Sequence, residues 1–352
     1  MIGIVTQPLG YNYGGILQNY ALQSALRTIG FDSVTIDVGY GYSYSRFVMS
    51  RTLSFLLNCF GAKRPYPAKP FNGRCIPPQT GSFIQKNIRT TRPYSKYTKS
   101  CLEKYKIDTV IVGSDQVWRP MYNESIGNMF LDFVGNKCRK IAYGASFGVE
   151  QWEYSEEETS VCQELIKSFY GVSVREQSGV ALVKNRLKRD DVELVLDPTL
   201  LLNKKDYENL CADVSKASGD YICAYVLDST EITNKIVGEF SSRKRMTVKK
   251  MSAHKDIRMT VEEWLACIRD ASFVVTDSFH GMVFAIMFNR NFLVVPNRSR
   301  GIDRFLSLLS LLGLTDRLIV SAVDKSIDWP LVNQELEFYK ERSYAFLRKC
   351  LY

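Results

Sequence analysis

Metal-ligating residues are scarce or poorly spaced in this sequence. It has two histidines, His254 and His280, and its nine cysteines include no Cys-x-x-Cys pair. Zinc sites need cysteine and histidine ligands at close, regular spacing. The scattered cysteines, several of them inside apolar runs, are typical of reduced thiols in a core. We therefore expect no metal and no other cofactor.

Long hydrophobic runs are also absent. No stretch of 18 or more apolar residues occurs, and residues 1–5 begin at once as a buried strand. A membrane-spanning helix needs about 20 apolar residues, and a secretory signal needs a basic region followed by an apolar one. We expect the protein to remain in the cytoplasm.

The nucleotide-binding motifs that a glycine-rich loop would suggest are missing. Residues 11–15 (YNYGG) precede a helical pattern, but they lack the GxGxxG spacing and no Lys-Ser/Thr follows. A dinucleotide fold and a P-loop are therefore not supported. The loop with Asn12, Gly14 and Gly15 remains a candidate cradle for an anion.

The pattern of strands and helices indicates two α/β domains. A 352-residue chain with 45% hydrophobic and 24% charged residues suits two domains of ordinary soluble type. Short buried strands alternate with helices, which favours parallel sheets covered on both faces. We expect two Rossmann-like domains facing a crevice, residues 1–196 and 197–332. A C-terminal helix at 333–352 would pack either on the first domain or on its own, second domain.

The positive charge of the chain is concentrated in one segment. Residues 41–106 hold 13 lysines and arginines and one acid, Glu103, within a chain of net charge +9. Six prolines between 65 and 93 and many aromatic residues indicate an inserted, partly helical excursion, with a short helix near 47–60. Anionic lipid or a diphosphate-linked glycan suits this mixture better than nucleic acid, although an internal lid would look similar.

Two segments at strand ends could carry chemistry. Residues 277–281 (DSFHG) lie between a strand and a helix, where free amides favour anions and where His280 could act as acid or base. Gly281 would let a ligand approach, although a capping histidine remains the alternative. Residues 113–118 (GSDQVW) offer Asp115 to a sugar hydroxyl and Trp118 to a sugar face, unless Ser114 and Asp115 merely cap a helix.

Arginines provide the third group of candidates. Arg175 follows a short strand and could grip a carboxylate or phosphate, or form a surface pair with Glu176. Arg298, Arg300 and Arg304 follow the strand that ends near residue 296, so they should lie on the rim of the crevice or be solvated surface charges.

Six short segments, taken in order along the sequence, resemble the polysaccharide pyruvyl transferase family. They are residues 12–18 (NYGGILQ), 113–118 (GSDQVW), 146–148 (SFG), 173–176 (SVRE), 196–199 (LDPT) and 277–281 (DSFHG). The resemblance implies a fold of the GT-B glycosyltransferase type. It also implies transfer of pyruvate from phosphoenolpyruvate to two hydroxyls of a sugar in a surface polysaccharide such as a capsule or exopolysaccharide, with release of phosphate.

The resemblance also implies roles for individual residues. His280 matches the family's histidine, so we assign it, with Asp115, to catalysis. The donor side comprises Arg175, Ser278, Gly281, Arg298, Arg300 and Arg304, and the acceptor side comprises Asn12, Gly14, Gly15, Ser114, Gln116 and Trp118. Many members carry an arginine where this chain has Ser278, so one of the arginines at 298–304 would supply that charge.

Two alternatives remain open at this stage. The same architecture could serve a glycosyltransferase that uses a nucleotide sugar, because fold alone does not name the donor. The chain could also be a non-catalytic glycan-binding relative. For the pyruvyltransferase, we expect an acceptor linked to a lipid diphosphate, and contact of residues 41–106 with the inner face of the membrane.

Overall fold

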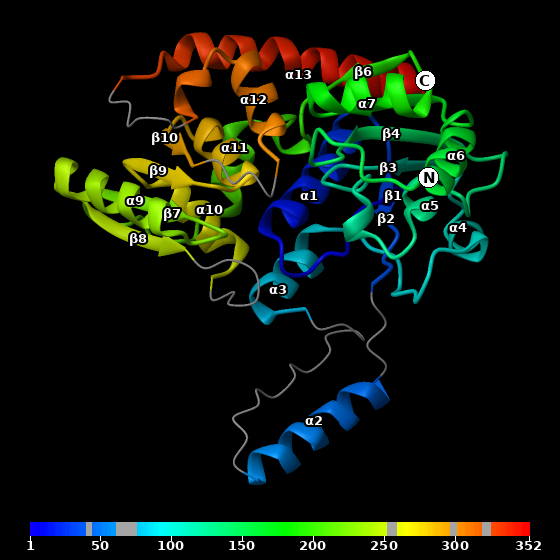
Figure 1. Ribbon diagram of the computed structural model, residues 1–352, viewed down its shortest axis with the longest axis horizontal. Helices are drawn as coiled ribbons and strands as arrows, with labels where there is room; N and C mark the ends of the chain where they lie inside the picture. The colour runs from blue at the N-terminus through cyan, green and yellow to red at the C-terminus, as the bar shows by residue number, and fades with distance from the viewer. Residues whose placement is uncertain (40–43, 61–75, 252–258, 296–300, 319–324) are drawn as a thin grey trace.

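The computed structural model of the chain describes residues 1–39, 44–60, 76–251, 259–295, 301–318 and 325–352. Two parallel β-sheets lie side by side, each with helices packed against it (Figure 1). The expected α/β class is therefore confirmed. In the part of the chain that is described, no helix is both long and apolar enough to cross a membrane.

The first sheet has six strands in the order β2-β1-β3-β4-β5-β6, all parallel. Its strands are β1 (Ile2–Val5), β2 (Ser33–Thr35), β3 (Thr109–Val112), β4 (Arg139–Ala145), β5 (Gly171–Val174) and β6 (Val192–Leu194). The strands are short and almost entirely buried, as expected of a parallel sheet covered on both faces. Their carboxyl ends share one edge, which places the loops after β1, β3 and β5 together.

Helices cover both faces of this sheet. One face packs on α1 (Tyr13–Thr28) and on the C-terminal helix α13 (Trp329–Leu351). The other face packs on a second group of helices. That group comprises α4 (Lys99–Lys104), α5 (Ile126–Met129), α6 (Glu156–Ile166) and α7 (Gln177–Leu187). Ser155 and Glu158 form a capping box that fixes the start of α6.

The second sheet has four parallel strands in the order β10-β9-β7-β8. They are β7 (Tyr221–Tyr225), β8 (Thr247–Met251), β9 (Phe273–Thr276) and β10 (Asn291–Val294). The helical segments around it are η2 (Pro198–Leu200), α8 (Lys204–Leu210), α9 (Glu231–Lys244), α10 (Val261–Arg269), α11 (Phe279–Met287), α12 (Asp303–Leu311) and η5 (Thr315–Arg317). Apart from His280, the side chains of helix α11 are apolar, and every residue of it is buried, so it forms the centre of this half.

The two halves are joined by direct contacts. Tyr13 of α1 stacks on Trp264 of α10, with ring centroids 5.4 Å apart, and its hydroxyl donates to the carbonyl of Met259 at 2.7 Å. At the start of α7, the amide of Gln177 donates to the Ser307 hydroxyl of α12 at 2.9 Å. These contacts bring the carboxyl edge of the first sheet against α11 and α12.

Helix α13 returns from the second half to the first (Figure 1). Its Tyr344, Phe346 and Leu347 belong to the same buried cluster as the strands of the first sheet. The hydroxyl of Ser343 also accepts a hydrogen bond from the amide of Leu196 at 2.9 Å. The segment that links the two halves, around Leu196, is therefore in contact with α13 as well as with the first sheet.

The segment 76–106 belongs to the core, contrary to the expectation that all of 41–106 lies outside it. Helix α3 (Pro78–Asn87) buries Phe83 and Ile84 in the cluster that includes α1. Gln23 of α1 donates to the Arg89 carbonyl and accepts from the Arg89 amide. The prolines suggested irregular structure in this segment. Pro78, however, occupies the first turn of a helix, a position that proline favours.

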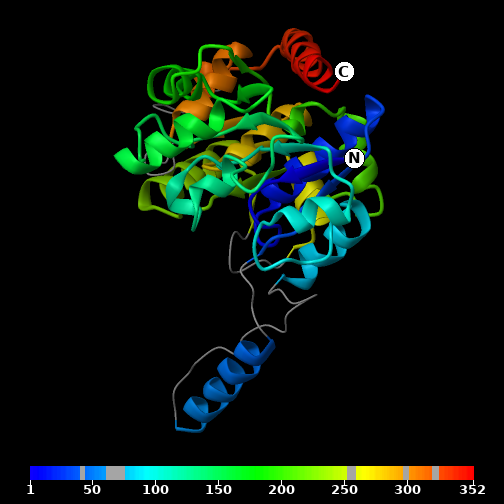
Figure 2. The same ribbon diagram turned by 90° about the vertical axis from the view of Figure 1, so that its right-hand side faces the viewer.

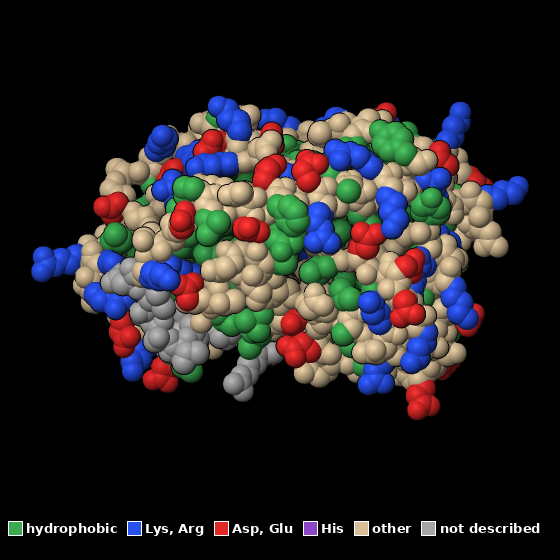
Figure 3. Space-filling view, turned by 90° about the horizontal axis from the view of Figure 1, so that it is seen from above, with side chains coloured by type: hydrophobic (Ala, Val, Ile, Leu, Met, Phe, Trp, Pro, Cys, Tyr) green, Lys and Arg blue, Asp and Glu red, His purple; other side chains and the backbone are tan. Residues whose placement is uncertain are grey.

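Helix α2 (Tyr44–Cys59) projects away from both sheets (Figures 1 and 2). Its large apolar side chains include several that are exposed, among them Met49 at 68%, Phe55 at 56% and Leu56 at 49%. Such exposure over one helix is unusual for the surface of a soluble protein and indicates a contact surface. By contrast, positive and negative side chains are intermixed on the face seen in Figure 3.

Candidate functional site

His280 lies in the first turn of α11, which directly follows β9. Ser278 caps this helix, because its hydroxyl accepts a hydrogen bond from the Gly281 amide at 3.4 Å. The carboxylate of Asp277 accepts bonds from the amides of residues 227–228 at 2.6 and 2.9 Å. The sequence from Asp277 to Gly281 therefore fixes where α11 begins and how His280 is presented.

The His280 imidazole is buried against the start of α1 from the other half. Gly14 leaves the space for it, since a Cβ atom at that position would overlap Nδ1 of the ring. The other nitrogen, Nε2, lies 3.8 Å from Oδ2 of Asp197, which is too long for a hydrogen bond. Among the described residues it has no hydrogen-bond partner, so it can still serve a ligand.

A buried ion pair between Arg175 and Asp197 supports this histidine. Nη1 of Arg175 donates to Oδ2 of Asp197 at 2.6 Å, and both side chains are fully buried. The amide and hydroxyl of Thr199 donate to the other carboxylate oxygen at 3.0 and 2.6 Å. Burial alone would raise the pKa of Asp197, but His280, Arg175 and Thr199 outweigh it and hold that pKa well below its usual range.

Arg175 is thus neither a surface partner of Glu176 nor a free cation. Its Nη2 also lies 3.4 Å from Oδ1 of Asp115, and Glu176 is buried beside it. Sequence reasoning gave Asp197 no role. The sequence does contain a signal that points to Asp197. It is an aspartate followed by proline at the end of a strand, within one of the segments that carry the family resemblance.

Asp115 lies at the carboxyl end of β3, facing α1. Its Oδ2 accepts from the Asn12 carboxamide at 3.1 Å, and its backbone has a φ of +65°. Gly113 precedes it with a φ of +134° and a cis peptide to Ser114, and a Cβ atom at Gly113 would overlap the Tyr143 carbonyl. Only glycine can come this close to the Tyr143 carbonyl, which explains why position 113 is a glycine.

Arg304, in the first turn of α12, is a buried cation that forms no ion pair within 4 Å among the described residues, although the carboxylates of Asp115 and Glu176 are near enough to raise its pKa. Its guanidinium lies 5.8 Å from the ring centre of Phe279 and 5.5 Å from that of Phe305, and it makes no hydrogen bond or ion pair there. Burial, together with repulsion from Arg175, lowers the pKa of Arg304 to about 10. Arg175 lies 4.8 Å from the same Phe279 ring.

Two acceptor roles expected from the sequence do not fit the structure. Trp118 is fully buried, stacks on Phe130 at 4.9 Å and donates its indole N–H to the Met129 carbonyl, so it offers no face to a sugar. Ser114 is also fully buried, and its hydroxyl donates to the Gly144 carbonyl. Both residues build the strand end that holds Asp115.

The remaining predicted residues have varied positions. Gly281 allows α11 to pack on Thr276 and Tyr225 rather than allowing a ligand to approach, which corrects its expected role. Gly15 lies beneath the pair of Asn12 and Asp115. The Gln116 side chain is partly exposed and accepts from Arg119 at 3.4 Å. Arg298 and Arg300 lie outside the described residues.

The arrangement can bind an anion and move a proton. An unpaired guanidinium and a helix N-terminus favour negative charge, and the free nitrogen of His280 lies in the same cluster. Asp115 adds a carboxylate from the opposite half. Among the described residues, this cluster contains groups from both halves. Asn12 and Asp115 belong to the first half, and Arg175 of the first half lies over the Phe279 ring of the second.

Solved structures resemble the chain over nearly its whole length. A Listeria monocytogenes protein described as a UDP-N-acetylglucosamine 2-epimerase has a TM-score of 0.50 at 11% identity, covering 98% of this chain and 90% of that one. The Methanocaldococcus jannaschii UDP-GlcNAc 2-epimerase in complex with UDP-GlcNAc and UDP has a TM-score of 0.45 at 14% identity, covering 96% and 92%. The likeness to the Listeria structure concerns the fold alone, and it agrees with the expected GT-B-type architecture.

Sequence comparison adds the family. No curated protein is a significant match to the whole sequence. A model of the polysaccharide pyruvyl transferase family matches residues 12–299, a span that contains Asn12, Asp115, Arg175, Asp197 and His280. This match covers most of the chain and includes every segment that suggested the family from the sequence. The chain therefore belongs to the polysaccharide pyruvyl transferase family.

Proposed function

We propose that the protein transfers pyruvate from phosphoenolpyruvate to two hydroxyls of one sugar in a polysaccharide precursor, forming a cyclic ketal. The observation that carries this proposal is a pair of buried nitrogens without hydrogen-bond partners among the described residues, Nε of Arg304 and Nε2 of His280. Both side chains lie around the Phe279 ring, with Arg304 5.8 Å and the His280 ring 5.4 Å from its centre. An uncompensated buried charge is costly unless a ligand pairs with it. A small, strongly anionic donor is the kind of ligand that would offset this cost.

Of the two described arginines that the sequence assigns to the donor, Arg175 and Arg304, we assign direct donor contact to Arg304. The nearest guanidinium nitrogen of Arg175 is already paired with Asp197 at 2.6 Å, whereas Arg304 has no such partner among the described residues. The carboxylate or phosphate of phosphoenolpyruvate would bind Arg304 bidentately. Ser278 caps α11, and the free amides of that helix start would add further donors.

The chemistry needs one proton delivered and two removed. His280 protonates C3 of the donor, which becomes a methyl group and leaves C2 electrophilic. The first sugar hydroxyl adds to C2 and loses its proton. The second hydroxyl displaces phosphate as the C2–O bond to phosphate breaks, and its proton leaves with the phosphate or to solvent. The formal reduction of C3 and the formal oxidation of C2 cancel, so no oxidant or reductant is consumed.

Asp115 is assigned to the acceptor hydroxyl. It lies in the first half, with Oδ1 3.4 Å from Nη2 of Arg175, and Asn12 orients its other oxygen. A carboxylate in this position would accept the first hydroxyl proton. Because Asp115, Arg175 and His280 are almost fully buried, substrates would reach them through a slight separation of the two halves.

The deciding experiment follows phosphate release and acceptor mass together. The protein is incubated with phosphoenolpyruvate and a panel of lipid-linked galactose- or mannose-containing acceptors. Phosphate release that requires both substrates, with a pyruvyl ketal gained by the acceptor, is the expected result. Transfer from UDP-sugars instead would identify a nucleotide-sugar glycosyltransferase, and glycan binding without turnover of any donor would identify a non-catalytic relative.

Helix α2 supports a lipid-linked acceptor at the inner membrane face. It carries Met49, Phe55 and Leu56 into solvent, within a sequence segment of net charge +12. Apolar bulk with basic residues nearby is the combination that binds an anionic bilayer surface. The protein would then work in the cytoplasm as a peripheral membrane enzyme.

A further inference from the structure

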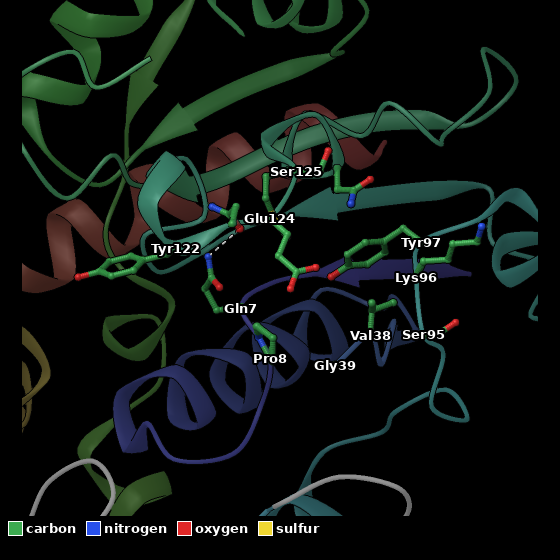
Figure 4. Close-up of a pocket in the computed structure, with 13 residues that line it drawn as sticks. Gln7, Pro8, Val38, Gly39, Ser95, Lys96, Tyr97, Tyr122, Glu124 and Ser125 are labelled. Atoms are coloured by element: carbon green, nitrogen blue, oxygen red, sulfur yellow. Dashed lines mark hydrogen bonds between the residues drawn. The ribbon is translucent and has the colours of Figure 1, made fainter. Parts of the chain in front are cut away.

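The first half contains a pocket beside the site already described. It lies at the carboxyl edge of the first sheet, between the loops that follow β1, β2 and β3 (Figure 4). Its volume is about 270 Å³, close to the lower end of the roughly 300–1,000 Å³ typical of small-molecule sites. His280 and Arg304 are not among the residues that line it, so it is a separate space.

The lining of this pocket suits hydroxyl groups. The Asn128 carboxamide and the Ser95 and Ser125 hydroxyls can donate and accept hydrogen bonds, and the side-chain oxygen of Gln7 can accept them. The Glu124 carboxylate extends into the space (Figure 4). A ring with several hydroxyls is the ligand that such a mixture of donors and acceptors matches.

The charge of the pocket differs from that of the His280 site. Among its lining residues, Lys96 and Glu124 are one cation and one anion, so their charges cancel. A phosphate or nucleotide diphosphate would lack the surplus of positive charge that such anions need. The pocket therefore favours a neutral ligand.

Two contacts connect this pocket to the proposed reaction centre. The Gln7 carboxamide donates to the Gln116 carbonyl at 3.3 Å and to Oδ1 of Asn123 at 3.1 Å, so one wall adjoins the residue after Asp115 (Figure 4). On the same side, the Tyr122 hydroxyl accepts from Arg119 at 3.4 Å and lies close enough to Arg304 to affect its pKa. A chain of sugars could thus pass from the pocket to Asp115.

We propose that this pocket is a subsite for a neutral sugar residue of the acceptor, next to the sugar that receives pyruvate. Glu124 and Asn128 bind its hydroxyls, and Tyr97 forms part of the wall. The assignment to the acceptor rests on the proposed function, whereas sugar binding in the pocket does not.

The test measures sugar binding without any donor. The full chain is titrated with methyl glycosides of galactose, mannose, glucose and N-acetylglucosamine and with their disaccharides, using calorimetry and saturation-transfer NMR. Variants Glu124→Gln and Asn128→Ala are compared with the wild type. Asn333→Ala is the matched control, because Asn333 is exposed on α13 and far from the pocket in the sequence and the fold. Arg304→Met reports on the donor site.

At least one sugar should bind the wild type, and each pocket variant should raise its Kd about three- to tenfold, the loss of one hydrogen bond. Asn333→Ala and Arg304→Met should leave that Kd unchanged. The proposal is overturned if no sugar binds the wild type, if the pocket variants weaken binding no more than the control, or if only Arg304→Met weakens it. Sugar binding in the pocket without phosphoenolpyruvate-dependent phosphate release would refute the pyruvyltransferase instead.

Discussion

Gly14 and His280, from opposite halves of the molecule, are in contact so close that no side chain fits between them. A Cβ atom at Gly14 would overlap Nδ1 of the imidazole, although 266 positions separate the two residues in the sequence. The start of α1 therefore determines where the His280 ring can lie. Gly14, in the first turn of α1, therefore acts on the proposed proton donor by leaving space for its ring.

Gly14→Ala should displace the His280 ring and lower kcat by at least about tenfold. It should also reduce the free energy of unfolding by about 1–3 kcal/mol, the usual cost of overpacking. Steady-state kinetics and urea unfolding measure the two effects. Gly10→Ala is the control, because a Cβ atom at Gly10 meets nothing within 4 Å. Equal kinetics for both variants would show that the contact does not matter.

His280→Ala should lower kcat by about 10²–10⁴-fold, the usual contribution of a general acid or base. The KM for the sugar acceptor should change little, because Asp115 and the first half remain intact. Single-turnover kinetics with phosphoenolpyruvate would separate binding from chemistry. A variant that keeps most of its turnover would remove His280 from proton transfer and leave it a packing residue beside Gly14.

How far the sequence predicts this site depends on the kind of residue. The sequence makes His280 and Asp115 candidates because they follow buried strands, and the structure places both at strand ends. Asp197 was missed because its role lies in a pair with Arg175, 22 positions away, and no local pattern encodes that pair. Trp118 was misread because an aromatic residue after a strand suits a core as well as a ligand site.

The fold shows the same contrast. Apolar strands and glycine-rich turns predicted the α/β class and the parallel sheets, since those signals are local. The burial of α3 was not predicted, because its contact with α1 joins residues far apart in sequence, such as Gln23 and Arg89. Packing between distant elements is a tertiary effect that neither composition nor periodicity contains.

Arg304→Met should weaken donor binding while stabilising the free protein. Loss of a charge-assisted contact raises the KM for phosphoenolpyruvate about 10–150-fold, whereas removal of an unpaired buried charge raises the free energy of unfolding by about 1 kcal/mol or more. Thermal unfolding with and without phosphoenolpyruvate tests both, because the donor should stabilise only the wild type.

The matched control for Arg304→Met is Arg342→Met. Arg342 also lies over an aromatic ring, 5.9 Å from the centre of Phe338, but it is exposed on α13. This control should leave stability and the KM for phosphoenolpyruvate unchanged. A stability gain in the control as large as that in Arg304→Met would contradict the idea of an uncompensated buried charge.

Asp197→Asn should destabilise the protein by about 3–5 kcal/mol at pH 7, because it leaves Arg175 buried without its closest partner. The pKa of Asp197 is depressed in the folded state, so its stabilising effect is complete above the unfolded pKa of about 3.9 and is lost as the pH falls further. The difference between wild type and variant should therefore stay constant from pH 7 to about pH 4. Below that it should shrink, whereas narrowing already near pH 6 would assign the effect to another group.

Replacing the exposed apolar side chains of α2 should abolish binding to membranes without harming the core. The triple variant Met49→Ser, Leu53→Ser and Leu56→Ser removes bulk from the helix that projects from both sheets (Figure 2). Burial of one such side chain contributes roughly 1.5–3 kcal/mol, so losing three should reduce co-sedimentation with anionic vesicles by at least about tenfold. A second triple variant, Val161→Ser, Ile232→Ser and Leu331→Ser, removes equally exposed residues elsewhere and should bind vesicles like the wild type.

Equal vesicle binding by the two triple variants would mean that α2 contacts a surface other than the bilayer. Loss of binding confined to the α2 variant, with turnover of a soluble acceptor retained, would place the helix at the bilayer and explain why the positive charge of the chain is concentrated around it.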